Sequence, residues 1–154
     1  MNLLSLTALT LVLVTIAPPA SAQAPERVSA VLEAIKAARG TRSLDRVWID
    51  LAYDEALAQT VGRVPDHRMR KVADALVCEG ATPSAQRCTI VDGDLVIAVR
   101  SVDVAGDRAS AVVDNIWISK GGREPSVAYV RRRYTLARSP QGWTVADRRV
   151  LHQS

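Results

Sequence analysis

The sequence predicts an α+β fold, with two or three N-terminal helices packed on a curved antiparallel sheet that ends in a four-strand meander. Two observations predict this class. Apolar residues recur with helical spacing in the first half of the chain, and they alternate with a period of two from Asp92 to the end. Turn sequences divide the alternating part into strands, namely Gly106-Asp107, Gly121-Gly122 and Ser139-Pro140-Gln141-Gly142.

The first 22 residues have the character of a signal peptide, which leaves residues 23–154 as a single α+β domain. Leu3 to Ile16 form an uncharged apolar run that is too short to span a membrane. Ala20-Ser21-Ala22 offers the small residues that signal peptidase accepts. We expect export to the periplasm or the medium and no transmembrane segment in the mature protein. No Lys or Arg precedes the apolar run, and a retained anchor helix is the alternative.

The positive charge belongs to the folded part, because residues 1–22 contain no charged side chain and the net charge is +4. A basic protein can bind nucleic acid, but export removes that partner. The chain has no Phe and only 4% aromatic residues, so it offers few stacking surfaces for single-stranded nucleic acid. We therefore expect no nucleic-acid partner.

The two cysteines, Cys78 and Cys88, predict a disulfide, since an even pair in an exported protein is usually bridged. A redox pair is the alternative, but the thioredoxin type has only two intervening residues. Metal binding is weaker still, because His67 and His152 are the only histidines and neither has a ligand at metal spacing. We expect neither a metal nor a cofactor.

Four elements precede the meander. A helix is predicted from Pro25 to Arg39, since Val28, Val31, Leu32 and Ile35 share one face. Alternation predicts a strand over Arg46–Tyr53. Asp54-Glu55 could cap a helical turn that runs through Ala58, and Pro65-Asp66 is expected to start a second long helix over Asp66–Val77.

The turns also predict registers. A two-residue turn at Gly106-Asp107 places Val104 opposite Ala109 and Val99 opposite Asp114. In the middle hairpin, a strict two-residue turn at Gly121-Gly122 would pair even-numbered residues of one strand with odd-numbered residues of the next. A longer loop centred on Arg123 would pair even-numbered residues with even-numbered ones, and we prefer this longer loop. That choice, with the last turn, predicts three further pairs: Asp114 with Arg132, Tyr134 with Asp147, and Leu136 with Val145.

The predicted inner face of the sheet carries polar exceptions that form our candidate ligand-binding site: Asp114, Arg132, Tyr134 and Asp147. Buried charges are costly unless they are paired, so Asp114 and Arg132 are expected to bond to each other. One interpretation is a salt-bridged end of the sheet. The functional interpretation is a cup in which Arg132 binds a small anionic ligand; if it were catalytic, an Asp would serve as general base.

The predicted outer face is less polar than a solvated face should be. Candidate interface residues there are Val113, Trp117, Tyr129 and Arg131. Apolar side chains rimmed by arginine suggest a homodimer or another protein contact through this face.

The helices followed by a meander that ends in Tyr134-Thr135-Leu136 and Gly142-Trp143-Thr144-Val145 resemble the cone-shaped α+β domains of the NTF2-like superfamily. They are also similar to small exported bacterial domains of unknown function. The superfamily resemblance implies a cavity between helices and sheet, frequent dimers across the outer sheet face, and both enzymes and binding proteins among its members. The His-Asp pair of some of its enzymes is not evident here.

We therefore expect a non-catalytic exported domain that binds a small molecule or a partner protein. The alternatives are a small lyase-, isomerase- or hydrolase-type enzyme that uses the Asp/Arg/Tyr cluster, and a structural component of the cell envelope.

Overall fold

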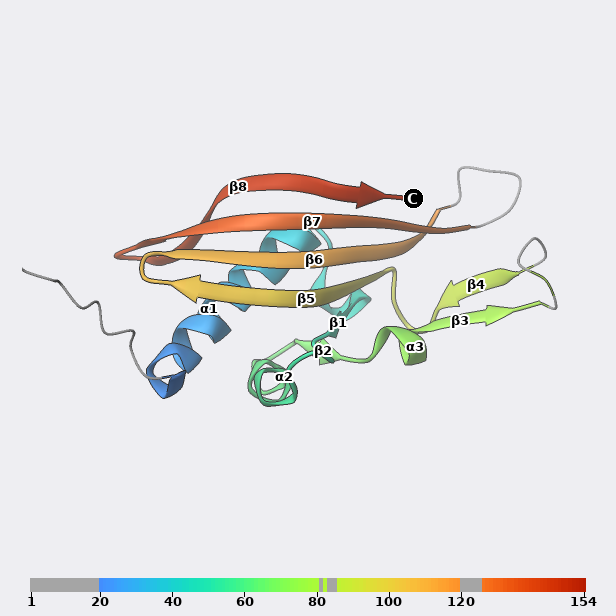
Figure 1. The fold of residues 1–154 in the computed structure, drawn as a ribbon. Helices are drawn as coiled ribbons and strands as arrows, with labels where there is room; N and C mark the ends of the chain where they lie inside the picture. Colours follow the sequence, from blue (N-terminus) through green and yellow to red (C-terminus); the bar gives the residue numbers. More distant parts are fainter. Residues whose placement is uncertain (1–19, 81, 83–85, 120–125) are drawn as a thin grey trace, which may run out of the picture.

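The computed structural model describes residues 20–80, 82, 86–119 and 126–154. Its main feature is a six-stranded sheet with the order β2-β1-β5-β6-β7-β8, beside a two-stranded sheet of β3 and β4 (Figure 1). The helices are α1 (Ala20–Arg39), η1 (Leu44–Arg46, one turn of 3-10 helix), α2 (Glu55–Gly62) and α3 (Val72–Ala75). The strands are β1 (Val47–Asp50), β2 (Arg68–Met69), β3 (Leu76–Glu79), β4 (Arg87–Ile90), β5 (Leu95–Ala105), β6 (Arg108–Ser119), β7 (Ser126–Ser139) and β8 (Gly142–Gln153).

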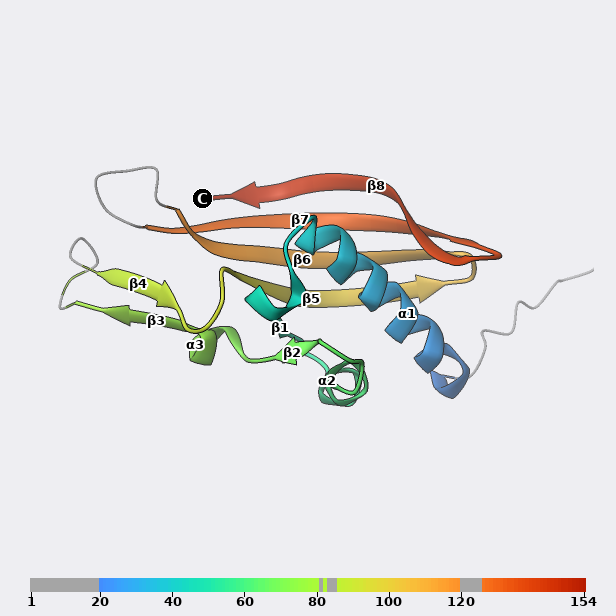
Figure 2. The ribbon, with the colours of Figure 1, turned by 180° about the vertical axis from the view of Figure 1, so that it is seen from behind.

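Helix α1 covers one face of the sheet, which we call the helix face. It lies across the long strands in Figure 2 and contacts β5, β6 and β8. In its predicted apolar stripe, Val31 and Ile35 are fully buried, and Val28 and Leu32 are partly buried against the same core. The helix begins at Ala20 rather than at Pro25 and ends before Gly40, whose φ of 61° suits glycine. Glu26 fastens it to the last hairpin by accepting hydrogen bonds from Arg138 and Trp143.

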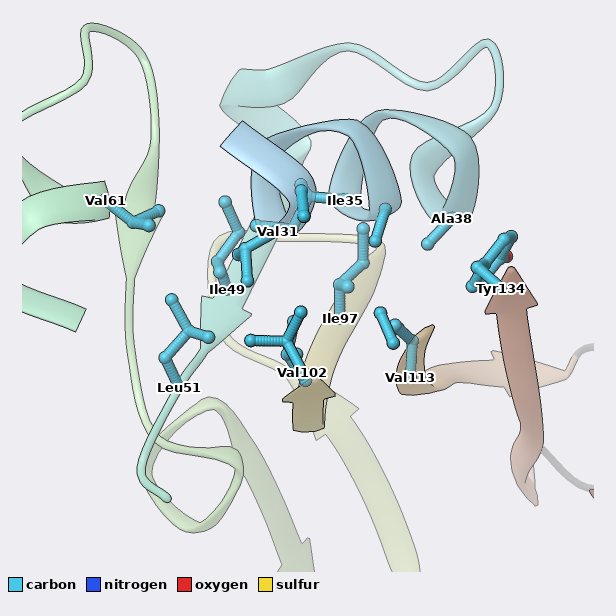
Figure 3. Close-up of a cluster of buried hydrophobic side chains, with 14 of the residues drawn as sticks. Val31, Ile35, Ala38, Ile49, Leu51, Val61, Ile97, Val102, Val113 and Tyr134 are labelled. Atoms are coloured by element: carbon cyan, nitrogen blue, oxygen red, sulfur yellow. The ribbon is translucent and has the colours of Figure 1, made fainter. Parts of the chain in front are cut away.

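The main core lies between α1, α2 and the helix face (Figure 3). Burial of this apolar surface is the largest favourable contribution to folding. The opposite, outer face has a smaller cluster at one end, where Ala75 of α3 packs on Val96 and Ile116.

The N-terminal part of the sheet is a β-α-β unit. Strand β1 runs parallel to both β2 and β5. Asp54 caps α2 by accepting a hydrogen bond from the Leu57 N–H, at 3.0 Å. Leu57 belongs to the main core on the helix face, whereas Ala75 of α3 belongs to the cluster on the outer face. The chain therefore leaves β1 toward one face and β2 toward the other.

The predicted fold class is wrong in its sheet and its helices. The sheet is mixed rather than antiparallel, and one long helix, α1, covers it; the last four strands do form an antiparallel meander. The helix expected over Asp66–Val77 is replaced by β2, the single turn α3 and β3. Tertiary contacts override its helical pattern, because the backbone of β2 pairs with β1 and the Val72 N–H donates to Asp50.

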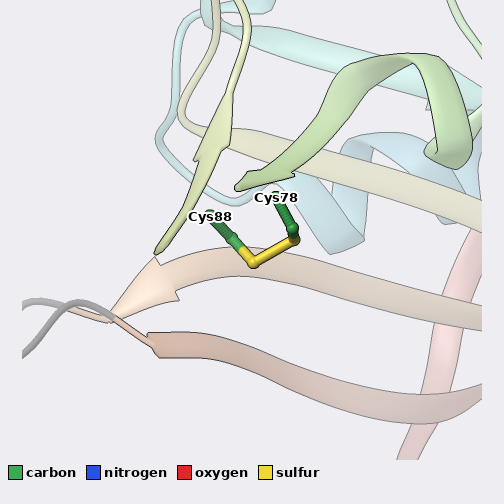
Figure 4. The surroundings of a disulfide bond; sticks show 2 residues. All are labelled: Cys78 and Cys88. Atoms are coloured by element: carbon green, nitrogen blue, oxygen red, sulfur yellow. A yellow bond between two sulfur atoms is a disulfide. The ribbon is translucent and has the colours of Figure 1, made fainter. Parts of the chain in front are cut away.

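The predicted disulfide is confirmed. Cys78 of β3 and Cys88 of β4 lie directly opposite each other in the two-stranded sheet and are bonded (Figure 4). An isolated two-stranded hairpin is marginally stable in water. The bridge therefore holds a part of the molecule that has little core of its own.

Candidate functional site

A β-bulge decides the surroundings of Asp114. The turn at Gly106-Asp107 pairs Val104 with Ala109 as predicted, but the register shifts between Val99 and Ser101. Val99 therefore lies opposite Val113, not opposite Asp114. The extra residue is Arg100, and its Nε donates to Asp114 Oδ2 at 2.8 Å. The bulge thus directs an arginine toward this carboxylate.

The register predicted for the middle hairpin is also wrong by one residue. Asp114 lies opposite Arg131, and Arg132 lies opposite Val113. The preferred loop, centred on Arg123, falls in residues 120–125, outside the described residues. The pair Ser119–Ser126 shows that an even number of residues connects the strands. Even-numbered residues of β6 therefore pair with odd-numbered residues of β7, whereas the preferred loop would pair even with even.

A second bulge separates Asp147 from Tyr134. Leu136 lies opposite Val145 as predicted, but the register then shifts, so Asp147 lies opposite Thr135 and Arg148 lies opposite Tyr134. The four candidates consequently divide between the two faces. Asp114 and Asp147 belong to the outer face, whereas Arg132 and Tyr134 belong to the helix face, and the predicted cup is not assembled.

Asp114 is a buried carboxylate with two partners, and its side chain is 2% exposed. Arg131 donates from Nε to Oδ1 at 2.7 Å and from Nη2 to Oδ2 at 2.9 Å, in addition to the bond from Arg100. Burial acts to raise the pKa of Asp114, but the hydrogen bonds from Arg131 and Arg100 outweigh it and leave the pKa below its ordinary value. The predicted ion pair between Asp114 and Arg132 is therefore wrong, and Arg131 and Arg100 hold the buried carboxylate instead.

Tyr134 belongs to the main core, on the side of Ala38 and Val113 (Figure 3). It is 1% exposed, and burial raises the pKa of its hydroxyl, against the opposing effect of Arg132 and Arg148. Its position indicates packing rather than contact with a ligand. Whether any of the four candidates binds a ligand stays a prediction.

The residues proposed for an interface do not form one surface. Val113 is fully buried in the main core and Trp117 packs against that core from the helix face. Tyr129 packs against the cluster on the outer face, where Arg131 holds Asp114. The one-residue change in register is the reason, because it places the side chains of β6 on the face opposite to the one predicted while those of β7 keep theirs. Dimerisation itself stays a prediction.

A cleft of about 710 Å³ lies at the carboxyl ends of β1 and β2. The chain leaves these adjacent parallel strands toward opposite faces, and such a divergence opens a crevice where ligands bind in open sheets with parallel strands. Its volume falls within the range of small-molecule sites. Apolar residues from both strands, from the segment after β1 and from α2 line the cleft: Ile49, Leu51, Ala58 and Met69. We call this feature the β1–β2 cleft.

Charged side chains of both signs surround this apolar lining. Glu55 of α2 and Asp74 of α3 supply carboxylates, and Arg70 and Lys71 supply cations. Asp50 also lines the cleft, but its two oxygens accept the N–H groups of Ala52 and Val72, each at 2.8 Å. Asp50 therefore ties the two diverging segments together and leaves the other four side chains to meet a ligand.

Arg70 is held in place from two sides. Its backbone N–H donates to Ile49 O at 2.9 Å, and its guanidinium lies over Trp48, 4.5 Å from the ring centroid. Trp48 is itself fixed by a 2.6 Å hydrogen bond from its indole N–H to Val91 O. Arg70 Nη1 is buried without a hydrogen-bond partner among the described residues. Arg70 therefore borders the cleft with a guanidinium that Trp48 orients.

Sequence reasoning missed the β1–β2 cleft because it assigned Asp66–Val77 to a helix, which leaves no room for a parallel β2. A two-residue strand gives no periodic signal of its own. The available signals were Trp48 and Asp50 within the strand predicted over Arg46–Tyr53, and neither identifies a partner strand. Within the described ranges, no group of three or more His, Cys, Asp or Glu side chains gathers as metal ligands would.

Comparison with known proteins finds no family model, no curated protein and no solved structure that matches the chain. The resemblance to the NTF2-like superfamily therefore stays a prediction. Among the described helices, none is both long and apolar enough to cross a membrane.

Proposed function

We propose that the protein is a non-catalytic binding domain that holds a small zwitterionic molecule, such as an amino acid or a short peptide, in the β1–β2 cleft. The observation that carries this proposal is the pairing of two cations and two carboxylates around an apolar lining. A ligand with an amino group, a carboxylate and an apolar side chain matches each of these parts. Arg70 and Lys71 would bind the carboxylate, and Glu55 and Asp74 would bind the amino group.

Binding without catalysis is favoured by the composition of the cleft. Its described lining contains no Ser, Cys, His or Tyr, and the buried carboxylate of Asp50 already accepts two backbone hydrogen bonds. An exported location agrees with the Cys78–Cys88 bridge, since disulfides persist in oxidising compartments. We include export in the proposal on this ground.

Thermal unfolding in the presence of amino acids and dipeptides tests the proposal. A ligand that binds the folded state only, at about 100 times its Kd, stabilises it by about 2.7 kcal/mol and raises the Tm by several degrees. We expect stabilisation by a zwitterion with an apolar side chain. Blocking either end, by N-acetylation or by amidation of the carboxylate, should reduce the Tm shift.

Two variants and a control complete this test. In Arg70→Gln, the Tm shift should no longer depend on a free carboxylate in the ligand. In Glu55→Gln, the Tm shift should depend less on a free amino group in the ligand. Arg63→Gln is the matched control, because Arg63 is exposed at the end of α2 and does not line the cleft. The proposal fails if no zwitterion stabilises the protein. It also fails if the wild-type protein binds the blocked ligands as tightly as the unblocked one and Arg70→Gln binds the unblocked ligand as tightly as wild type does.

A further inference from the structure

The last hairpin holds all of the excess positive charge of the chain. Residues 126–154 contain six arginines and one aspartate, a net charge of +5, whereas the whole chain has a net charge of +4. The remaining residues therefore sum to −1. The positive character belongs to β7 and β8 rather than to the molecule as a whole.

Strand β8 is a free edge of the six-stranded sheet, because β7 is its sole neighbour in the described strand order. It is long, Gly142–Gln153, and nearly all of its residues are exposed. Val150 is 51% exposed and Leu151 is 40% exposed, and they are two of the four large apolar side chains that are exposed among the described residues. An edge of this kind presents unpaired backbone N–H and C=O groups that can accept another strand.

Arginines on the outer face are placed against each other. Arg133 of β7 lies directly opposite Arg149 of β8, and both are exposed. Neither forms an ion pair within the described part of the chain. Like charges that face each other across strands destabilise a sheet. Charges on an edge can serve to prevent aggregation, but that reason does not apply to Arg133, which lies on an inner strand.

We propose that β8 binds an extended acidic segment of a partner protein, which adds to the sheet as a seventh strand. Backbone hydrogen bonds to the free edge would supply much of the affinity, and alternate side chains would supply specificity. Carboxylates on the outer face of the added strand meet Arg149, with Arg133 one strand further in. Apolar side chains on the other face of the added strand lie beside Val150.

Charge favours this occupant over a second copy of the chain. Pairing β8 with β8 would bring together two hairpins that each carry a net charge of +5, whereas an acidic strand neutralises the hairpin. This surface lies on the opposite edge of the sheet from β2 and the β1–β2 cleft. The inference is therefore independent of the proposed small-molecule site.

The test uses the full chain and a fluorescent nine-residue peptide, capped at both ends, in which Glu alternates with Val or Thr. Fluorescence anisotropy measures its Kd. We expect the peptide to bind at least tenfold more tightly than the same peptide with Lys in place of Glu, with an affinity that falls as salt is added. Arg149→Glu should weaken binding at least tenfold. Arg63→Glu, directly after α2 and outside β7 and β8, makes the same change in charge and should leave binding unchanged.

Backbone methylation separates strand addition from simple charge attraction. In an added strand, only every second amide N–H points toward β8. N-methylation of one alternate set of peptide amides should therefore weaken binding at least tenfold, and methylation of the other set should have little effect. Equal effects of the two sets, or no binding of the acidic peptide, would overturn the proposal. So would a dimer of the protein alone that Arg149→Glu converts to a monomer, since the edge would then belong to a second copy.

Discussion

At the scale of single residues, Asp114 shows how a charge is kept inside a sheet. A carboxylate that is removed from water without partners costs several kcal/mol, and two arginines offset that cost here. The side chains of Arg100 and Arg131 remain 44% and 40% exposed, so they keep part of their hydration while they hold the buried oxygen atoms. The arrangement fixes the bulge at Arg100 and the register of β6 against β7.

Asp114→Asn tests this account through its dependence on pH. The pKa of Asp114 is lower in the folded state, so its contribution to stability is complete above the pKa of the unfolded chain, about 3.9. That contribution declines as the pH falls toward the folded pKa. We expect Asp114→Asn to lower the free energy of unfolding at pH 7 by about 1 to 3 kcal/mol. Urea denaturation should show that the difference from wild type shrinks below pH 4.

A difference between the two proteins that stays constant from pH 7 to pH 3 would contradict this result. Asp147→Asn is the control, because Asp147 is exposed and has no ion pair among the described residues. Its substitution should change stability by less than about 0.5 kcal/mol at either pH.

At the scale of elements, the sequence predicts most where one local pattern decides the outcome. Helical spacing identifies α1, the capping aspartate identifies the start of α2, and Gly106-Asp107 identifies the β5–β6 turn. The sequence predicts least where contacts between residues far apart in the chain determine which strand residues pair. Two bulges and one loop parity change the partners of Asp114, Arg132 and Asp147, and none of these features leaves a periodic signal.

The two-stranded sheet of β3 and β4 should depend on its disulfide more than any other element. The bridge closes a loop of about ten residues, which corresponds to about 2 to 3 kcal/mol on the chain-entropy model. Reduction should therefore speed amide hydrogen exchange in Leu76–Glu79 and Arg87–Ile90 while β5, β6 and β7 stay protected. A double variant, Cys78→Ser with Cys88→Ser, should behave like the reduced protein and should not respond to reductant. Loss of protection throughout the six-stranded sheet would show that the bridge stabilises the whole fold instead.

At the scale of the whole molecule, the mixed sheet has two edges with different characters. One edge ends in the short β2 and bears the β1–β2 cleft, with charges of both signs around apolar side chains. The other edge is the long, basic β8. The sequence pattern placed the candidate site inside the meander. A helix predicted over Asp66–Val77 left no strand that could run parallel to β1, so the cleft between β1 and β2 was not expected. The cleft arises from long-range pairing that one-dimensional patterns do not contain.

The central claim is that the β1–β2 cleft binds a small zwitterion, and a titration followed by nuclear magnetic resonance tests it most directly. ¹⁵N-labelled protein would be titrated with the most stabilising amino acid or dipeptide, and backbone amide shifts would be mapped onto the fold. We predict that the largest changes fall on Ala52, Glu55, Arg70, Lys71 and Asp74, and that in Arg70→Gln the titration no longer distinguishes a free ligand carboxylate from an amidated one. Changes confined to β7 and β8, or the absence of any saturable change, would contradict the claim.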